Sequence, residues 1–414
     1  MAIVFHPLFA NIGQQQEVRS LVLSYILQHS NLDVEQEYCH AEAFLQSYSA
    51  SPDTFKSYRR EIERLLQWCW FTAKIKLLDV DRELFEEYLT YAFSPPSNMI
   101  ASKSAPRFIK KDNIYVANSE WRPYLNRVSK AQKSLKLNTE TKAYLMSTNA
   151  RKALFAGVST FCTYLLQENY LLRNPVALLR QKSRYIVKTQ TANITRKLTD
   201  LQWHYVIKVI EEKTKVDIKY ERHLFIISVF YMLGLRISEI AISSLHNPVM
   251  GDFYRDKDGL WWLKVIGKGN KSREIAVPNE MLNCLKRYRA YLGLTPLPLR
   301  DEQTPILHNY KNKGGLSIRQ VRTLVQECFD FASTSLQRDN LIDEAQDLMS
   351  ATVHWLRHTS ISADVKHRPR DHVRDDAGHE SISTTDRYID IDKMDRHKSA
   401  QDKKLYPELE RVEN

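Results

Sequence analysis

The sequence predicts a mainly α-helical protein of two domains, with a small antiparallel β-sheet in the second domain. A chain of 414 residues is too long to bury one compact core, so two domains are the default expectation. Only 11 residues are glycine and helix-forming residues are plentiful, which favours helices. Apolar residues recur at helical spacing in the first half, whereas the second half contains two β-favouring segments around a polar turn.

Amphipathic helices are expected throughout the first half. The Ser-Pro-Asp sequence at residues 51–53 is typical of a helix start, and apolar residues follow it at three- and four-residue steps. Residues 79–93 predict a second amphipathic helix, and residues 141–172 predict one or two more. Residues 94–134 contain prolines and lysines without a clear period, so a loop or an insertion is expected there.

A change of character near residue 181 predicts the domain boundary. Residues 1–180 form the expected N-terminal helical domain, residues 181–196 a basic linker, and residues 197–414 the second domain with its C-terminal tail. The first helix after the linker is expected to begin with Thr199 or Asp200 as its N-cap, because both side chains accept hydrogen bonds from free backbone N–H groups.

The second domain is expected to contain a buried helix followed by a β-hairpin. The apolar run at residues 224–235 is too short to span a bilayer and predicts a buried helix. Residues 260–266 and 272–277 favour strands and flank the turn Gly-Lys-Gly-Asn, which predicts the hairpin.

Charge indicates a polyanionic partner. Sixty Lys and Arg residues against 49 Asp and Glu residues give a net charge of +11, which favours nucleic acid first and an anionic membrane second. A solvated basic surface is the ordinary explanation of such a run, but residues 169–199 contain no acidic residue at all, which favours contacts with phosphates. The expected phosphate contacts are Arg173, Arg180, Lys182, Arg184 and Lys188.

Cysteine usage and the N-terminus narrow the class of protein. The five cysteines are scattered and form no C-x-x-C pair, which favours a reducing compartment and argues against a disulfide framework or a cysteine zinc site. His354 and His358 have the spacing of metal ligands on a helix, but no acid or cysteine accompanies them, so no metal is expected. The first ten residues lack a basic region followed by a long apolar run, so no signal peptide is expected.

Four short segments of the second half carry suggestive chemistry. Each segment has an ordinary explanation: a buried arginine usually pairs with an acid, here Glu239, and a lysine at a hairpin tip is usually solvated. The segments are GLRISE, IGKGNKSRE, HWLRHT and AGHESISTTDRY, and their reactive residues are Arg236, Lys268, His354, Arg357, His379 and Tyr388.

Taken in this order, the segments resemble the tyrosine recombinases, also called the phage integrase family. The resemblance extends over residues 198–388, and HWLRHTS and AGHESISTTDRYI are its most specific parts. Tyr388 lies nine residues after His379, as the family prefers. The N-terminal helices are similar to the family's core-binding domain in type and position only. The resemblance implies a two-domain architecture, a helical core-binding domain and a mixed α/β catalytic domain.

The resemblance also implies a role for each residue. Arg236 and Arg357 clamp the scissile phosphate, since guanidinium groups stay protonated and donate as a fork. Tyr388 attacks the phosphorus and forms a 3′-phosphotyrosyl bond. Lys268 is the general acid for the 5′-oxygen, with Lys271 of the same turn as the runner-up. His354 takes part in proton transfer with the nucleophile, and His379 forms a hydrogen bond with the phosphate. Glu239 supports Arg236 or His354, and His358 is structural or contacts the DNA backbone.

By resemblance, the protein is a site-specific DNA recombinase or integrase that acts without a cofactor in the integration, excision or resolution of mobile DNA. Its implied partners are double-stranded DNA with specific attachment sites, three further copies in a homotetramer on paired sites, and accessory host factors. The implied location is the bacterial cytoplasm, at the nucleoid, and no membrane is expected. A type IB-like topoisomerase and a non-catalytic DNA-binding protein are the alternatives; the complete set of residue types argues against the second.

The sequence departs from the family in three places. The segment between Arg357 and His379 is unusually charged, and Ala377 stands where leucine is expected before the Gly-His pair. The stretch between Arg236 and Lys268 is longer than in compact members, and residues 94–134 are added to the first domain.

Overall fold

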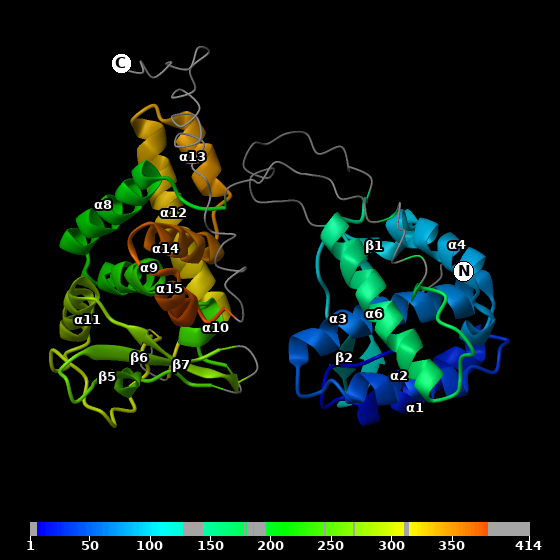
Figure 1. The fold of residues 1–414 in the computed structure, drawn as a ribbon. Helices are drawn as coiled ribbons and strands as arrows, with labels where there is room; N and C mark the ends of the chain where they lie inside the picture. The colour runs from blue at the N-terminus through cyan, green and yellow to red at the C-terminus, as the bar shows by residue number, and fades with distance from the viewer. Residues whose placement is uncertain are drawn as a thin grey trace, which may run out of the picture. The chain divides into compact units, whose positions relative to one another are not determined.

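The computed structural model describes residues 6–126, 144–177, 179, 185, 196–243, 246–267, 270–309 and 314–379. The chain divides into two compact units, residues 1–191 and residues 192–414 (Figure 1). Each unit has its own hydrophobic core. Most of the expected linker, residues 181–196, lies outside the described residues.

The first unit is a helical domain with short strands. Its helices are α1 (Gln15–His29), α2 (Glu35–Gln46), α3 (Pro52–Gln67), the π-helix η1 (Trp68–Ala73), η2 (Leu77–Asp79), α4 (Arg82–Phe93), η3 (Ser97–Met99) and α6 (Thr148–Gln167). Helix α3 begins at Pro52, as expected, and buries Phe55, Ile62 and Leu65 in the core that it shares with α6. Helix α4 is capped by the Asp81 side chain, which accepts a hydrogen bond from the Leu84 N–H group.

The expectation of a loop at residues 94–134 was wrong for its described part. Four short strands lie there: β1 (Ile100–Ala101), β2 (Phe108–Lys111), β3 (Ile114–Ala117) and β4 (Tyr124–Leu125). Strands β2 and β3 form an antiparallel hairpin whose turn residues, Asp112 and Asn113, both have positive φ. Strands of two to four residues are too short to show a period, and the Asp-Asn turn is a signal for β2 and β3 only.

The second unit packs helices above a three-stranded antiparallel sheet. Its helices are α8 (Asp200–Val216), η4 (Ile218–Tyr220), α9 (Glu221–Leu233), α10 (Ile237–Ile240), η5 (Met250–Asp252), α11 (Asn279–Tyr291), α12 (Ile318–Arg338), α13 (Ile342–Met349), α14 (Val353–His367) and α15 (Arg370–Ala377). The strands are β5 (Phe253–Arg255), β6 (Trp261–Ile266) and β7 (Ser272–Ala276), in the order β5-β6-β7.

The structure confirms the main expectations for this unit. Thr199 caps α8 in a capping box with Gln202, and residues 224–230 of α9 are all buried. Strands β6 and β7 form the predicted hairpin, with Leu263 opposite Ile275. No helix in the described parts of the chain is long and apolar enough to cross a membrane. Figure 1 shows α10 and α15 next to β7, and this region holds the candidate site.

Candidate active site

Arg236 is placed by the sharp end of the buried helix α9. Gly234 ends this helix with φ of +57°, and a side chain there would meet the Ser360 Oγ at 3.1 Å. Arg236 lies two residues later, in extended conformation, as the residue before the short helix α10. Its guanidinium donates to the Glu239 Oε1 at 3.0 Å and to the Gly378 carbonyl at 3.0 Å. Arg236 is therefore held while a third of its side chain stays exposed.

Glu239 lies beneath Arg236 and is fully buried. Its Oε2 accepts the Arg236 backbone N–H at 2.7 Å, and Arg273 of β7 donates to both carboxylate oxygens, at 2.7 and 2.9 Å. Burial alone raises the pKa of Glu239, but the hydrogen bonds and charge of Arg273, followed by those of Arg236, outweigh burial and leave the pKa below its usual value. Glu239 is therefore a carboxylate that holds two guanidinium groups.

Arg357 lies in α14 and is almost completely buried. Its Nη1 donates to the Gly234 carbonyl, and its Nη2 donates to the Ala377 carbonyl at 2.7 Å. The same Nη2 lies 3.3 Å from the His379 Nε2. Arg357 thus joins the end of α9, the end of α15 and the histidine that follows α15.

His379 lies at the end of the described chain, just after α15. Gly378 ends that helix with φ of +62°, and the His379 N–H donates to the Arg374 carbonyl at 3.1 Å. Burial lowers the pKa of His379 to about 4, and the positive charges of Arg357 and Arg236 act in the same direction. The ring is therefore neutral at pH 7.

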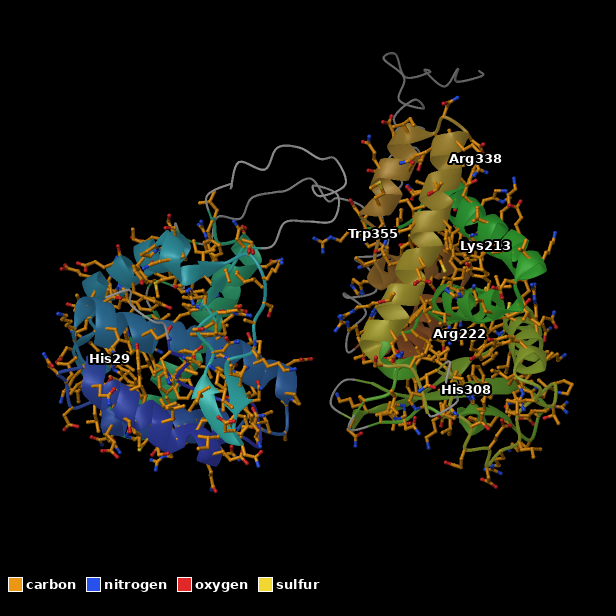
Figure 2. All side chains as sticks on the ribbon, turned by 180° about the vertical axis from the view of Figure 1, so that it is seen from behind. His29, Lys213, Arg222, His308, Arg338 and Trp355 are labelled. Carbon is orange, nitrogen blue, oxygen red and sulfur yellow. The ribbon has the colours of Figure 1, made fainter. Side chains whose placement is uncertain are left out.

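His354 lies on the exposed side of α14, one turn before His358. The centroids of the two imidazole rings are 4.3 Å apart. Partial burial lowers the pKa of His354, and the charge of Arg357 adds to this effect. Trp355, the next residue of α14, is labelled in Figure 2 and locates this part of the helix. Arg236 and His354 line a groove of about 680 Å³, together with Arg322 and Gln326 of α12.

The charged segment before His379 is a set of ion pairs. Arg368 contacts Asp364 at 3.0 Å and Asp376 at 2.5 Å, which ties α14 to α15. Arg374 contacts Asp371 and Asp375 at 3.1 and 2.8 Å. Ala377 packs with Ile361 and Val373 in a small apolar cluster, so α14 and α15 are joined by an apolar contact as well as by the ion pairs of Arg368.

The structure brings five of the expected residues together: Arg236, Glu239, His354, Arg357 and His379. Lys268 and Tyr388 lie outside the described residues, as do Arg180, Lys182, Arg184 and Lys188. Arg173 is described and exposed, in the first unit.

Sequence reasoning missed Arg273 and the groove residues of α12. The signal for Arg273 was its place as the last basic residue of the GKGNKSR segment, next to the expected lysines. Its partner Glu239 lies 34 residues earlier, and no local pattern connects the two. Arg322 and Gln326 carry no motif.

Comparison with known sequences finds similarity to one family of proteins. Residues 198–394 match the phage integrase family. The tyrosine recombinase XerC of Thermodesulfovibrio yellowstonii is 27% identical over 255 residues, which cover 59% of this chain and 72% of the relative. The tyrosine recombinase XerD of Staphylococcus saprophyticus is 26% identical over 261 residues, which cover 61% of this chain and 73% of the relative.

Solved structures share the fold along nearly the whole chain. XerH site-specific recombinase, bound to a palindromic difH substrate, superposes with a TM-score of 0.53 and 16% identity over 95% of this chain and 91% of that chain. A lambda integrase dimer bound to a COC′ core site gives a TM-score of 0.51 and 12% identity over 96% and 87%. The solved structures share the fold, and the family match, the sequence relatives and the motif order agree that residues 198–394 form a domain of the phage integrase family of tyrosine recombinases.

Proposed function

We propose that the protein cuts and rejoins DNA at specific sites through a 3′-phosphotyrosyl intermediate formed by Tyr388. The convergence of Arg236, Arg357 and His379 within one network carries this proposal. Two guanidinium groups and a neutral imidazole at one place suit a phosphodiester whose non-bridging oxygens gain charge during displacement.

The proposed cleavage step balances in bonds and protons. The Tyr388 phenol oxygen attacks the phosphorus, and the bond from phosphorus to the 5′-oxygen breaks. His354 accepts the phenol proton, since its lowered pKa leaves the ring neutral, and Lys268 gives a proton to the 5′-oxygen. A 5′-hydroxyl of the partner strand then reverses the reaction. The phosphodiester's energy is conserved in the tyrosyl ester, so the chemistry requires no metal and no cofactor.

The proposed substrate is double-stranded DNA with specific attachment sites. The XerH and lambda integrase structures hold DNA substrates, which supports this choice. We propose four copies on two paired sites, with accessory host factors, acting at the nucleoid in the bacterial cytoplasm. Arg173, Arg180, Lys182, Arg184 and Lys188 are proposed phosphate contacts. Integration or excision of a mobile element is the proposed outcome.

Covalent trapping tests the mechanism and needs no defined target sequence. A library of nicked duplexes with randomised arms is incubated with the protein in EDTA, denatured, and searched for protein–DNA adducts, whose DNA is then sequenced. The wild type and Tyr406→Phe, a matched change near the C-terminus, are expected to form the adduct, whereas Tyr388→Phe is expected to form none.

An adduct that survives Tyr388→Phe, or that requires added metal, contradicts the proposed mechanism. The sequenced adducts also separate recombinase from topoisomerase. A recombinase enriches one sequence, whereas a topoisomerase yields adducts of unrelated sequence and relaxes a plasmid that lacks the enriched site.

A further inference from the structure

We propose that Arg273 is a positioning residue, one that keeps the positive charge of Arg236 available to the scissile phosphate by sharing the carboxylate of Glu239. This inference rests on the proposed function and adds to it a residue that has no contact with DNA in its assigned role. It concerns the charge of the site.

The carboxylate of Glu239 is saturated by its two arginines. Its Oε1 accepts from the Nη1 atoms of Arg236 and Arg273, at 3.0 and 2.7 Å. Its Oε2 accepts from the Arg236 backbone and from the Arg273 Nη2, at 2.7 and 2.9 Å. The shorter side-chain contact and the paired fork belong to Arg273. Glu239 is therefore bound more firmly to Arg273 than to the guanidinium of Arg236.

Arg273 determines the net charge of the cluster formed by Arg236, Glu239 and Arg273. Two arginines and one carboxylate leave the cluster one positive unit, which lies on the exposed Arg236 side. Without Arg273, the buried carboxylate would pair with Arg236 alone, and the cluster would be neutral. Since Coulomb interactions are strong where water is excluded, a neutral cluster stabilises the growing charge on the phosphate less.

The site is shaped for the guanidinium of Arg273. Its Nε donates to the Asp376 carbonyl at 2.8 Å, while both terminal nitrogens contact Glu239, so all three nitrogens are used. Glycines lie on either side of it. A Cβ at Gly267 would approach the Arg273 Nη1 to 3.2 Å, and a Cβ at Gly378 would approach the Arg273 Nε to 3.0 Å. A lysine has neither the fork nor the reach to make these contacts together.

A double-mutant cycle in the full-length protein tests the charge-sharing role. The variants are Arg273→Gln, Glu239→Gln and their combination, assayed for single-turnover cleavage of a nicked duplex recovered by covalent trapping. Arg273→Gln is expected to slow cleavage by roughly 10- to 100-fold, because the cluster loses its net charge. The double variant restores that net charge and is expected to cleave faster than Arg273→Gln alone.

Arg255→Gln is the matched control. Arg255 lies in the same sheet, is exposed, and donates through its Nε to a backbone carbonyl, that of Gly259, at 3.0 Å. This variant is expected to cleave at the wild-type rate. DNA affinity, measured by equilibrium binding, is expected to change little in all variants compared with the cleavage rate.

A substrate without the critical charge gives a second readout. In a methylphosphonate duplex, a methyl group replaces one non-bridging oxygen, so less negative charge develops at the phosphorus. The rate ratio of wild type to Arg273→Gln is expected to fall on this substrate. A residue that acted only on the fold would slow both substrates equally.

Two results overturn the inference while the proposed function stands. Wild type cleaves, and either Arg273→Gln cleaves as fast as Arg255→Gln, or the double variant is no faster than Arg273→Gln. If Arg273→Gln does not fold, the cycle is read in the Glu239→Gln background, where removing Arg273 must cost less than about threefold. Failure of the proposed function gives a different result, since wild type then forms no adduct.

Discussion

At the scale of single residues, the candidate site concentrates positive charge around neutral histidines. Arg357 is buried, Arg236 is partly exposed, and both lower the pKa of His379, after burial. The positive charge that a phosphate would meet in this site therefore comes from the guanidinium groups, because the imidazole of His379 is uncharged at pH 7.

The depressed pKa of His379 predicts an acid-sensitive fold. In the unfolded chain the ring titrates near 6.5, and in the folded protein near 4, so between these values the unfolded chain binds more protons. The stability that neutral His379 supports is therefore complete above pH 6.5 and is lost as the pH falls towards 4. Urea unfolding at pH 7.5 and pH 5 measures the loss.

His379→Asn is the comparison for this prediction, because other histidines of the second unit, among them His223 and His308, also have lowered pKa values. Wild type is expected to lose more stability than His379→Asn between the two pH values. Equal losses would show that His379 titrates alike in the folded and unfolded chain.

Sequence motifs predicted most of the described site residues, but they did not predict how charge is shared among them. Arg236, His354 and Arg357 each stand in a short pattern that can be read locally. The pairing of Arg273 with Glu239 depends on a strand meeting a helix from a distant part of the chain, and this is a property of the fold.

At the scale of elements, the end of α15 sets the place of His379. Gly378 has φ of +62° and lies against Arg273, so substitution meets two obstacles there. Gly293 has a similar φ of +70°, but nothing lies within 4 Å of where its Cβ would be. Comparing substitutions at Gly378 and Gly293 therefore separates the cost of backbone strain from the cost of a steric clash with Arg273.

Gly378→Ala is expected to destabilise the second unit more than Gly293→Ala. Gly293→Ala should cost about 1 kcal/mol of unfolding free energy, the strain of a left-handed residue alone. Gly378→Ala adds the displacement of Arg273 and should also slow cleavage. Urea unfolding and trapping measure the two effects.

Equal costs for the two glycine variants would mean that the Arg273 guanidinium moves aside freely. A normal cleavage rate in a destabilised Gly378→Ala protein would mean that the conformation of this turn does not affect the cleavage step.

Long elements were predictable and short ones were not. Helix α3 and the β6–β7 hairpin each offer enough residues for a period, or a recognisable turn between two strands. The strands of residues 100–125 offer two to four residues each, and their pairing depends on tertiary contacts. The ion pairs of Arg368 likewise follow from how α14 meets α15.

At the scale of the whole molecule, two units with separate cores are joined by a basic, acid-free stretch of sequence. Phosphate contacts made by that stretch would release counterions from DNA, and affinity would then depend strongly on salt. The net charge of +11 gives the chain a general attraction for DNA, whereas the position of the charge decides which residues track the backbone.

Neutralising Arg180, Lys182 and Arg184 together as glutamines is expected to weaken binding to all DNA sequences. The slope of log affinity against log salt should become less steep by roughly 0.9 for each phosphate that the protein no longer neutralises. Fluorescence anisotropy over a series of salt concentrations measures the slope.

A matched triple variant of exposed lysines on α8 and α11, Lys208, Lys215 and Lys286, removes the same charge elsewhere. Its slope is expected to stay close to that of wild type. If the two triple variants behave alike, net charge alone governs binding and the basic stretch has no special part.

The anchoring of Arg357 has a consequence for how such an enzyme can diversify. Its guanidinium is held by the main-chain oxygens of Gly234 and Ala377, and every amino acid supplies such an oxygen. Position 377 can therefore change its side chain, as alanine in place of the expected leucine illustrates, without removing the acceptor. Libraries that randomise position 377 alone should therefore retain members in which Arg357 keeps this anchor, whereas the left-handed backbone of Gly234 and of Gly378 restricts those two positions.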